Sequence, residues 1–492
     1  MEWTVLLKPE KVRQKSSVTK TSNDARSPFK VDFDTVCNCT GIRRLQDKAQ
    51  VFPLEKGDYA RTRLTHSIEV MSIAESLGVH AVKVIQEKTN PDSKLAEQLK
   101  EIPVILRTAA LLHDMGNPPF GHLGEGIIGD WFKTKLARLI IEPKTQKVIF
   151  SENTSVGVNR LIDILSEEQK SDLRNFEGNA QLLRLISKLN YVVDENGMNL
   201  TYPVLATIIK YPCSAISCEK AKTNKTSRLL NKKPGYFSSE RDLYEKINSS
   251  LGLNNKRYPL TFLLEAADDI AYLTADIEDA HKKGIISFTT IEKYFETYNS
   301  EHKDAFVQSI IDEIAKYRVQ GAEQGITDID NYVMQRLRIF IKGNMISRVM
   351  DSFEKNYTNI MNGSFEDELL NDSEANGVVS IIRENIEKKH IYYCKEIVNS
   401  KIKSYKILST LLDSFIPCVF NFEKEGKNDD KDSLIYNLLS DNYRFICNKA
   451  TSGLKLYEPD YIYNKLLLVT DFISGMTDSY AKDMYELLVS IK

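Results

Sequence analysis

Apolar residues recur at the spacing of an α-helix along most of this chain, as in residues 64–77 and 408–415. That period places one apolar stripe on each helix, and the stripes must pack against one another. Strand-like runs are few: residues 147–150, and residues 191–194 with 198–201 across a Glu-Asn-Gly turn, which predicts a small hairpin. The chain is therefore predicted to be mainly α, with at most a few short strands.

The chain is long enough to bury a large core. Its 492 residues are 42% hydrophobic, and this length suits either two or three domains or one elaborated helical domain. Polar or glycine-containing breaks, each short enough to be a surface loop, lie at residues 86–94, 218–234, 361–377 and 423–432. The basic residues of 219–233 are Lys220, Lys222, Lys225, Arg228, Lys232 and Lys233. The sequence leaves open whether this stretch is a solvated loop or a phosphate or DNA contact.

The composition argues against several classes of protein. Lys and Arg number 66 against 68 Asp and Glu, so the chain has no overall positive charge with which to hold nucleic acid or a membrane surface. The seven cysteines are scattered without a Cys-x-x-Cys pair, which argues against a disulfide framework and a cysteine zinc site. We find no signal peptide and no run of about 20 apolar residues. These features predict a soluble, cytoplasmic protein with no membrane partner.

Three of the seven histidines fall in two short segments, residues 61–66 and 113–125. His66 shares a helical face with an apolar run, and His113 ends an apolar helix, so both imidazoles are predicted to point inward. Either histidine alone is more typical of a core residue than of a metal ligand. His113 is followed directly by Asp114, however, and then by glycine and proline residues that break the helix. Two metal-binding side chains are thus expected to converge at a helix end.

An acidic stripe runs along the helix predicted over residues 262–279. Asp268, Tyr272, Asp276 and Asp279 lie at positions i, i+4, i+8 and i+11 of this helix. Such a stripe usually faces solvent, but the residues beside it are rich in Leu, Ala and Ile. A carboxylate buried there must be paired or must bind a cation.

Two imidazoles and two carboxylates form a mixed nitrogen and oxygen ligand set. The four side chains are His66, His113, Asp114 and Asp268. This set suits an octahedral Mn, Fe, Co or Mg centre better than a closed structural zinc site. An ion with open positions can lower the pKa of bound water and neutralise phosphate oxygens. The pattern therefore predicts metal-dependent hydrolysis.

Six blocks, found in family order between residues 27 and 481, resemble those of the deoxyguanosine triphosphate triphosphohydrolase (dGTPase) family of HD-domain phosphohydrolases. The blocks are Arg43-Arg-Leu-Gln-Asp-Lys-Ala-Gln-Val-Phe, Arg61-Thr-Arg-Leu-Thr-His-Ser-Ile-Glu, His113-Asp-Met-Gly-Asn-Pro-Pro-Phe-Gly-His-Leu-Gly-Glu, Phe176-Glu-Gly-Asn-Ala-Gln, Glu265-Ala-Ala-Asp-Asp-Ile-Ala-Tyr and Asp471-Phe-Ile-Ser-Gly-Met-Thr-Asp. The resemblance implies a helical HD-type catalytic core over residues 27–300 with a loop insertion near 218–234. Residues 1–26 would be an N-terminal extension, and the helical region 301–492 would pack on the core and complete the nucleotide site.

The resemblance also implies which residues carry the chemistry. The metal would be held by His66, His113, Asp114 and Asp268, and the catalytic pair would be His122 with Glu125. Their spacing supports the pair independently, because two residues three apart at the start of a helix share a face. Water held at the metal would attack the α-phosphorus and release tripolyphosphate whole. Which proton the histidine moves stays open.

Substrate contacts follow from the same resemblance, and they are Gln50, Val51, Arg63, Asn179, Lys210, Tyr211, Lys233, Tyr272 and Asp276. Cations and an amide among them would grip the triphosphate, and the others would line the deoxyribose. A ribose 2′-hydroxyl would crowd Tyr272, which is a steric reason to prefer deoxynucleotides. The base would be read in the C-terminal half, where Tyr443-Arg444 is a candidate.

These implications amount to hydrolysis of dGTP to deoxyguanosine and tripolyphosphate. One divalent metal, Mn, Mg, Fe or Co, would serve each active site, and additional Mg would accompany the triphosphate. The alternatives are a broad-specificity dNTP triphosphohydrolase, another HD nucleotide phosphohydrolase, or a nonenzymatic nucleotide sensor or nucleic-acid-binding protein, which would not need His122 and Glu125. The resemblance further implies a homo-oligomer, with a hexamer favoured, and an effector that is single-stranded DNA or a nucleotide.

Overall fold

The computed structural model describes residues 1–13, 24–52, 61–152, 159–190, 196–226, 229–422 and 430–490. In this part of the chain every element is helical except one antiparallel sheet of two strands, β1 (Leu139–Ile141) and β2 (Val148–Phe150). Leu139 pairs with Phe150, and Ile141 pairs with Val148. The prediction of a mainly α chain with a few short strands is confirmed, and the run at 147–150 corresponds to β2.

The hairpin predicted around Glu-Asn-Gly does not form as expected. Its first half, residues 191–194, lies outside the described residues, and residues 198–201 are not a strand. The backbone N–H of Met198 donates to a carbonyl at the end of the preceding helix (2.8 Å), and that of Thr201 donates to the carboxylate of Asp32 (2.8 Å). These two backbone N–H groups therefore form hydrogen bonds outside any β-sheet. The strand predicted over residues 198–201 is wrong.

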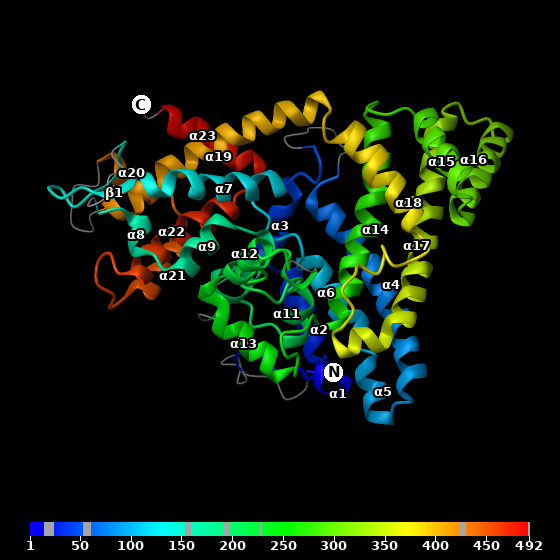
Figure 1. Ribbon diagram of the computed structural model, residues 1–492, viewed down its shortest axis with the longest axis horizontal. Helices are drawn as coiled ribbons and strands as arrows, with labels where there is room; N and C mark the ends of the chain where they lie inside the picture. Colours follow the sequence, from blue (N-terminus) through cyan, green and yellow to red (C-terminus); the bar gives the residue numbers. More distant parts are fainter. Residues whose placement is uncertain are drawn as a thin grey trace.

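Long helices form the centre of the molecule. α4 (Arg63–Thr89), α14 (Pro259–Lys282) and α17 (Ile329–Asn362) run along one another in the right-hand part of Figure 1, and α6 (Ile102–Leu112) packs on α4. The helices α4 and α6 approach closely at Gly78, where an added Cβ would lie 2.8 Å from the backbone of α6. Their facing stripes are apolar and buried, as the helical spacing of the sequence predicts.

A second group of helices lies on the left of Figure 1 and includes most of the C-terminal chain. Within it α7 (His122–Lys135) packs against α19 (Lys395–Asn421), which also contacts α22 and α23. The other helices of this group are α8 (Leu161–Ile164), α9 (Glu167–Arg174), α20 (Lys431–Asn437), α21 (Asp441–Thr451), α22 (Pro459–Ser474) and α23 (Asp478–Ser490). The site described below lies between this group and the central helices.

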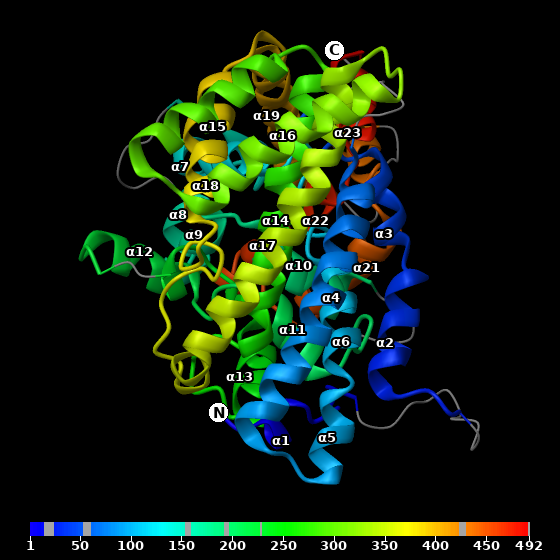
Figure 2. The same cartoon turned by 90° about the vertical axis from the view of Figure 1, so that its right-hand side faces the viewer.

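The remaining elements connect and cover these two groups. Beside α17, the helices α15 (Phe288–His302) and α16 (Ala305–Glu323) form a pair, seen at the upper left and centre of Figure 2. The chain then returns to α14 through α18 (Asn376–Ser380) and the helical segment η6 (Ile381–Ile391). The shorter elements are α1 (Trp3–Leu6), α2 (Pro28–Cys37), α3 (Thr40–Arg44), η1 (Leu45–Asp47), α5 (Ser93–Leu99), η2 (Leu136–Arg138), α10 (Gly178–Arg184), η3 (Leu185–Leu189), α11 (Tyr202–Ile208), α12 (Ala215–Thr223), η4 (Leu229–Asn231), η5 (Ser238–Glu240) and α13 (Arg241–Ser250).

The loop between α6 and α7 is held tightly in an irregular conformation. Phe120 has a φ of +66°, which is unfavourable for a residue with a side chain. Its backbone N–H donates to the Oδ1 of Asp478 (2.9 Å), and the Nζ of Lys48 donates to the carbonyl of Asn117 (2.5 Å). At Gly116 an added Cβ would lie 2.1 Å from a carbonyl of α10. Segments near the two ends of the chain thus contribute to the shape of this loop.

A buried ionic cluster fastens α22 to the core. Arg184 of α10 donates from Nε and Nη2 to the carboxylate of Asp471 (2.7–3.0 Å), and its Nη1 donates to Glu240 (3.1 Å). All three side chains are at most 5% exposed. Burial disfavours the charged guanidinium, but Asp471 and Glu240 outweigh it and raise the pKa of Arg184. The cluster therefore ties three distant parts of the chain together.

The expected domain boundaries after residues 26 and 300 stay predictions. In the structure α1 is buried against the end of α17, where the indole of Trp3 donates to Tyr357 (2.8 Å). The loop insertion expected near 218–234 begins inside α12, which continues to Thr223. Of the helices that the structure describes, none has the length and apolar character that crossing a bilayer requires.

We expect Arg184→Ala to lower the free energy of unfolding by about 3–5 kcal/mol, because it leaves the buried Asp471 without a compensating charge and Glu240 with Lys188 as its remaining cation. Denaturant titration followed by circular dichroism measures this loss. Lys388→Ala is the control, since the exposed pair of Lys388 with Glu384 should contribute less than about 1 kcal/mol. An equal effect of the two substitutions would contradict the role given to the buried cluster.

Candidate metal centre and active site

Four side chains from separate parts of the chain meet beside the loop that follows α6. His66 lies in the first turn of α4, His113 and Asp114 follow α6, and Asp268 lies in the middle of α14. The Nε2 atoms of His66 and His113 are 3.0 and 3.5 Å from the Oδ1 of Asp268. Ligand atoms of His66, His113 and Asp114 all lie within 4.8 Å of one another. The structure thus brings together the four predicted metal ligands.

The geometry of this cluster fits a cation. The Nδ1 of His113 is 2.7 Å from the carbonyl of Ala110, so its N–H is used there and Nε2 presents a lone pair to the cluster. Nε2 of His113, Nδ1 of His66 and Oδ2 of Asp114 are buried and have no hydrogen-bond partner among the described residues. Burial disfavours the imidazolium, yet Asp114 and Asp268 raise the pKa of His113 to about 9. A site that stabilises positive charge to this extent can accept a divalent ion instead of a proton.

The predicted catalytic pair lies at the first turn of α7. The Nδ1–H of His122 donates to the Oε2 of Glu125 (2.8 Å), which raises the pKa of the imidazole. Glu125 is buried, and its Oε1 accepts the backbone N–H of Gly178 (3.0 Å). The side chain of His122 is 74% exposed, so a fixed carboxylate orients an accessible ring. This arrangement leaves Nε2 of His122 for proton transfer.

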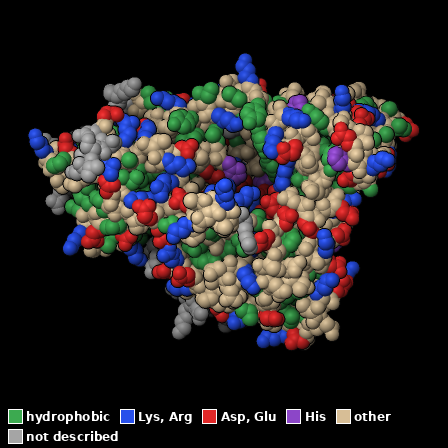
Figure 3. All heavy atoms as spheres, in the orientation of Figure 1, with side chains coloured by type: hydrophobic (Ala, Val, Ile, Leu, Met, Phe, Trp, Pro, Cys, Tyr) green, Lys and Arg blue, Asp and Glu red, His purple; other side chains and the backbone are tan. Residues whose placement is uncertain are grey.

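A cavity of about 240 Å³ opens beside the metal-ligand cluster. In Figure 3 histidine and acidic side chains are visible inside a central hollow, with basic side chains at its rim. The predicted site residues on its wall are His113, Asp114, His122, Asn179, Lys210, Tyr211, Lys233 and Asp268. The cavity therefore joins the candidate metal cluster, the predicted catalytic histidine and two of the cations predicted to bind phosphate.

Three other predicted substrate residues, Arg63, Gln50 and Val51, are not on the wall of this cavity. The Nη1 of Arg63 is 2.9 Å from the Oδ1 of Asp114, and the guanidinium is buried behind this carboxylate. Gln50 is half-buried with a buried Oε1 that has no partner within the described chain, and Val51 next to it is half-buried. Arg63 thus contacts a metal ligand directly, which its sequence motif did not reveal.

Tyr272 and Asp276 lie further along α14 in a buried polar cluster. The hydroxyls of Tyr272 and Tyr392 lie within hydrogen-bond distance of each other, and that of Tyr272 lies 3.3 Å from the Oε2 of Glu387, so the two hydroxyl protons are shared among these three oxygens. The hydroxyl of Tyr392 lies 3.1 Å from the same Oε2. Both carboxylate oxygens of Asp276 and the Oε1 of Glu387 are buried and have no hydrogen-bond partner in the described part of the chain. Unsatisfied acceptors in one place indicate a position for a ligand that donates hydrogen bonds.

Comparison with known proteins agrees with this geometry. Residues 63–175 match the HD domain family. The chain is 42% identical to a deoxyguanosinetriphosphate triphosphohydrolase-like protein of Listeria monocytogenes and equally to one of Listeria innocua, over 99% of both chains in each comparison. It is 31% identical to a deoxyguanosinetriphosphate triphosphohydrolase of Yersinia pestis, over 94% of both chains. The chain belongs to the deoxyguanosinetriphosphate triphosphohydrolase family. It is accordingly an enzyme of the hydrolase class with an HD domain.

Two groups of residues that contact the candidate site in this dGTPase-family protein were missed by the sequence reasoning. Lys48 and Asp478 hold the loop that carries the metal ligands, although both lie inside blocks that resemble the family. Glu387 and Tyr392 contact Tyr272, and they lie in a region for which no motif was recognised. Several other charged residues lie in the same helical segment, Ile381–Ile391, so its sequence did not distinguish Glu387.

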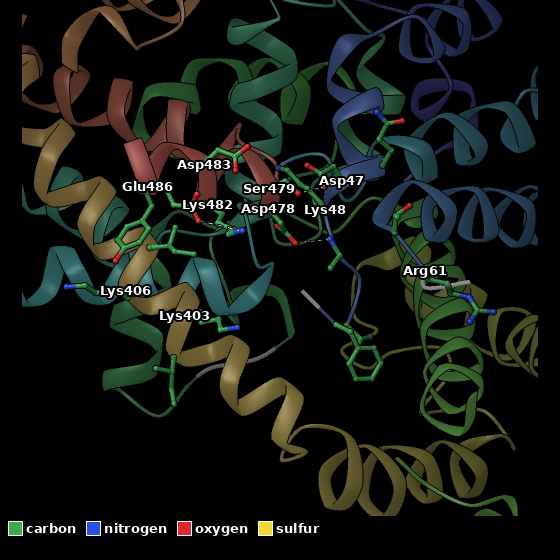
Figure 4. A pocket seen from close by; sticks show the side chains of 18 of the residues that line it. Asp47, Lys48, Arg61, Lys403, Lys406, Asp478, Ser479, Lys482, Asp483 and Glu486 are labelled. Atoms are coloured by element: carbon green, nitrogen blue, oxygen red, sulfur yellow. Dashed lines mark hydrogen bonds and ion pairs between the residues drawn. The ribbon is translucent and has the colours of Figure 1, made fainter. Parts of the chain in front are cut away.

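A larger cavity of about 800 Å³ lies between the segment around Lys48, the end of α14, α19 and α23. Figure 4 shows that its wall carries side chains of both signs. Asp47 accepts from Ser479 (2.9 Å), and Lys482 lies 3.6 Å from Glu486, so much of this charge is bonded within the wall. Lys48 is 2% exposed, and burial lowers its pKa to about 7. Through Lys48 this wall is connected to the loop that carries the metal ligands.

The sequence offered two sets of basic candidates, the stretch 219–233 and the pair Tyr443-Arg444, and the structure places them apart. Lys220 and Lys222 are exposed on α12, and Lys225 is exposed just beyond it, while Arg228 lies outside the described residues. Lys232 and Lys233 lie on the cavity wall instead. Tyr443 is buried on α21, and Arg444 beside it forms ion pairs and hydrogen bonds with neighbouring polar residues, away from both cavities described here.

We expect Asp268→Ala and His113→Ala to weaken binding of a divalent metal at least about tenfold, because each removes one of four ligands. Metal content after dialysis, measured by mass spectrometry, tests this. Asp269→Ala is the matched control, since that neighbouring carboxylate pairs with Arg383 (3.0 Å) and not with the histidines. His122→Ala should also retain the metal. Equal metal content in Asp268→Ala and wild type would remove Asp268 from the ligand set.

Proposed function

We propose that this protein hydrolyses dGTP to deoxyguanosine and tripolyphosphate. The observation that carries the proposal is one cavity beside a cluster of four side chains that can hold a cation, whose wall also carries an imidazole oriented by a carboxylate and three lysines, Lys210, Lys232 and Lys233. A relative from Yersinia pestis is named deoxyguanosinetriphosphate triphosphohydrolase, which supports the same substrate. A bound divalent ion would lower the pKa of water and neutralise phosphate charge.

The chain's own residues account for bond breaking at the α-phosphorus. His122 lies at the cavity mouth with Nε2 free, and the buried Glu125 stabilises its protonated form. This imidazole can move a proton between attacking water, the phosphoryl oxygens and the departing 5′-oxygen. Lys210, Lys233 and Asn179 line the same cavity and can hold three linked phosphates as one leaving group.

The polar cluster on α14 supports selection of the deoxyribose. Burial and the nearby Glu387 raise the pKa of Asp276 well above its usual value. A protonated carboxyl can both donate to and accept from a sugar 3′-hydroxyl. The ring of Tyr272 lies one turn before Asp276 and would crowd an additional 2′-hydroxyl. Gln50 and Val51 would line the other side of the sugar.

Glu387 is the base-reading residue that the geometry favours. It is 2% exposed, bonds to Tyr272 and Tyr392, and keeps one oxygen without a partner among the described residues. Burial raises its pKa to about 6, so the carboxylate is ionised at neutral pH. An ionised carboxylate can accept from both N1–H and the 2-amino group of guanine, whereas adenine has no N1–H and no 2-amino group. Arg444, the candidate from the sequence, is engaged on the surface instead.

A broad-specificity dNTP triphosphohydrolase is the second candidate, because the phosphate and sugar contacts do not depend on the base. The metal is proposed to be one Mn, Mg, Fe or Co ion per site, with further Mg on the triphosphate. Assembly into a homo-oligomer, of which a hexamer is favoured, a cytoplasmic location, and an effector that is single-stranded DNA or a nucleotide all stay predictions.

Product analysis tests the proposed reaction. Incubation of the metal-loaded protein with dGTP should release deoxyguanosine and tripolyphosphate in equal amounts, separated by ion-exchange chromatography. We expect His122→Ala to lower kcat by about 10²–10⁴-fold, as is typical for loss of a general acid–base group, without loss of metal. Release of orthophosphate or pyrophosphate as the first product would reject the proposal.

Base selection is tested by Glu387→Gln. We expect kcat/KM for dGTP to fall by about 10–100-fold, the loss typical of one bidentate base contact, with a much smaller change for dATP and dTTP. Glu384→Gln is the control on the same helical segment, because Glu384 is about half exposed and pairs with Lys388. An equal loss for all dNTPs in Glu387→Gln would instead indicate a general role for this carboxylate.

A further inference from the structure

Two buried glutamates lie at the phosphate end of the cavity, where negative charge is unexpected. Glu265 is on the cavity wall and 4% exposed, and Glu177 is also 4% exposed. Both belong to the segments that resemble the family, and neither has been given a role above. In a site that is to bind a polyanion, such carboxylates should weaken binding unless their charges serve another purpose.

Glu265 lies between two cations. Its Oε1 is 3.0 Å from the Nζ of Lys210, and its Oε2 is 2.6 Å from the Nη2 of Arg257. Arg257 is 2% exposed and lies over the ring of Phe262, 4.5 Å from its centroid, so its guanidinium is fixed away from the cavity. The three charges sum to +1, and Lys210 is the cation that reaches the cavity wall.

Glu177 makes the same arrangement with the second lysine. Its Oε2 is 2.9 Å from the Nζ of Lys233, and its Oε1 accepts from the amide of Asn179 (2.9 Å). Lys233 also lies 3.8 Å from Glu125, the partner of the catalytic histidine. Lys210 and Lys233 on the wall are therefore each paired with a carboxylate that is itself buried.

We propose that Glu265 and Glu177 are positioning residues that hold Lys210 and Lys233 in the geometry required to bind the triphosphate. This inference rests on the proposed function. A lysine ammonium ends a flexible side chain and loses about 2 kcal/mol of rotamer freedom when it is fixed. A buried carboxylate fixes it before the substrate arrives, so less of that loss falls on binding.

The carboxylates also keep the lysines charged. Burial favours the neutral amine, but Glu265 outweighs it and raises the pKa of Lys210. For Lys233, Glu177 and Glu125 have the same effect against burial. Without its glutamate each lysine amine would have a lower pKa, and its side chain would no longer be held in one orientation toward the cavity. The glutamates therefore strengthen a phosphate site indirectly, although their own charge repels phosphate.

Glu265→Gln separates this role from simple repulsion, because the amide keeps the shape and removes the charge. If Glu265 only repelled the ligand, its loss would tighten binding of inorganic tripolyphosphate. A positioning role predicts roughly tenfold weaker binding, the typical effect of losing one charged hydrogen bond, together with a higher KM for dGTP and a nearly unchanged kcat. Calorimetry on the metal-loaded, nucleotide-free protein measures the tripolyphosphate affinity.

A double-mutant cycle shows whether the glutamate acts through its lysine. In a Lys210→Ala background, Glu265→Gln should change tripolyphosphate affinity by less than about twofold. The same cycle applies to Glu177→Gln with Lys233→Ala. This second cycle still tests the proposal if Glu265→Gln fails to fold because Arg257 has lost its partner. Glu240→Gln is the control for a buried, ion-paired glutamate outside the cavity, and it should leave the affinity unchanged.

The outcomes distinguish this inference from the proposed function. The wild-type protein could fail to hydrolyse dGTP while the glutamate variants bind tripolyphosphate more weakly than wild type does. That result would support the positioning role and reject the proposed activity. Normal hydrolysis of dGTP with unchanged or tighter tripolyphosphate binding in both variants would overturn positioning alone. Additive losses in both cycles, or no tripolyphosphate binding by wild type, would also overturn it.

Discussion

The negative charges of the carboxylates buried on α14 must be balanced by other groups, and the rest of the structure depends on this constraint. An uncompensated buried charge costs several kcal/mol, so each one needs a partner from another element. Glu265 is paired with Lys210 before α12, Asp268 with the histidines of α4 and α6, and Asp269 with Arg383 of η6. The helices around α14 therefore meet it where its charges lie. Packing and the active site are set by the same contacts.

The meeting of the four predicted metal ligands in one cluster could be expected from the sequence because each of them is marked by a local pattern. His66 and His113 occupy apolar helical faces, Asp114 follows at a helix end, and Asp268 belongs to an acidic stripe with apolar flanks. Burial of such residue types demands a partner, and a cation is the partner that four of them can share. The mainly α fold was predictable for a similar reason, since helical spacing repeats over many residues.

Contacts between distant segments could not be predicted in this way. Asp478 stabilises the strained backbone of Phe120, 358 positions away, and no local pattern in either segment records this. The failed hairpin has the same cause, because Thr201 donates to Asp32, 169 positions away. A turn-like tripeptide is a weak local preference, and a single buried hydrogen bond to a charged group outweighs it. Tertiary contacts thus decided the places where local patterns were ambiguous.

Charge balance explains why this active site contains carboxylates that touch no metal ligand. A cavity lined only by lysines would be unstable before substrate binds, since each buried ammonium would lose its proton or turn toward solvent. Glu265 and Glu177 remove that difficulty, at the cost of reducing the net positive charge. Attraction for a phosphate is then determined less by the total charge than by where each ammonium is held. Under the proposed function, a site built in this way would favour a phosphate chain of matching length and shape over anions of equal charge.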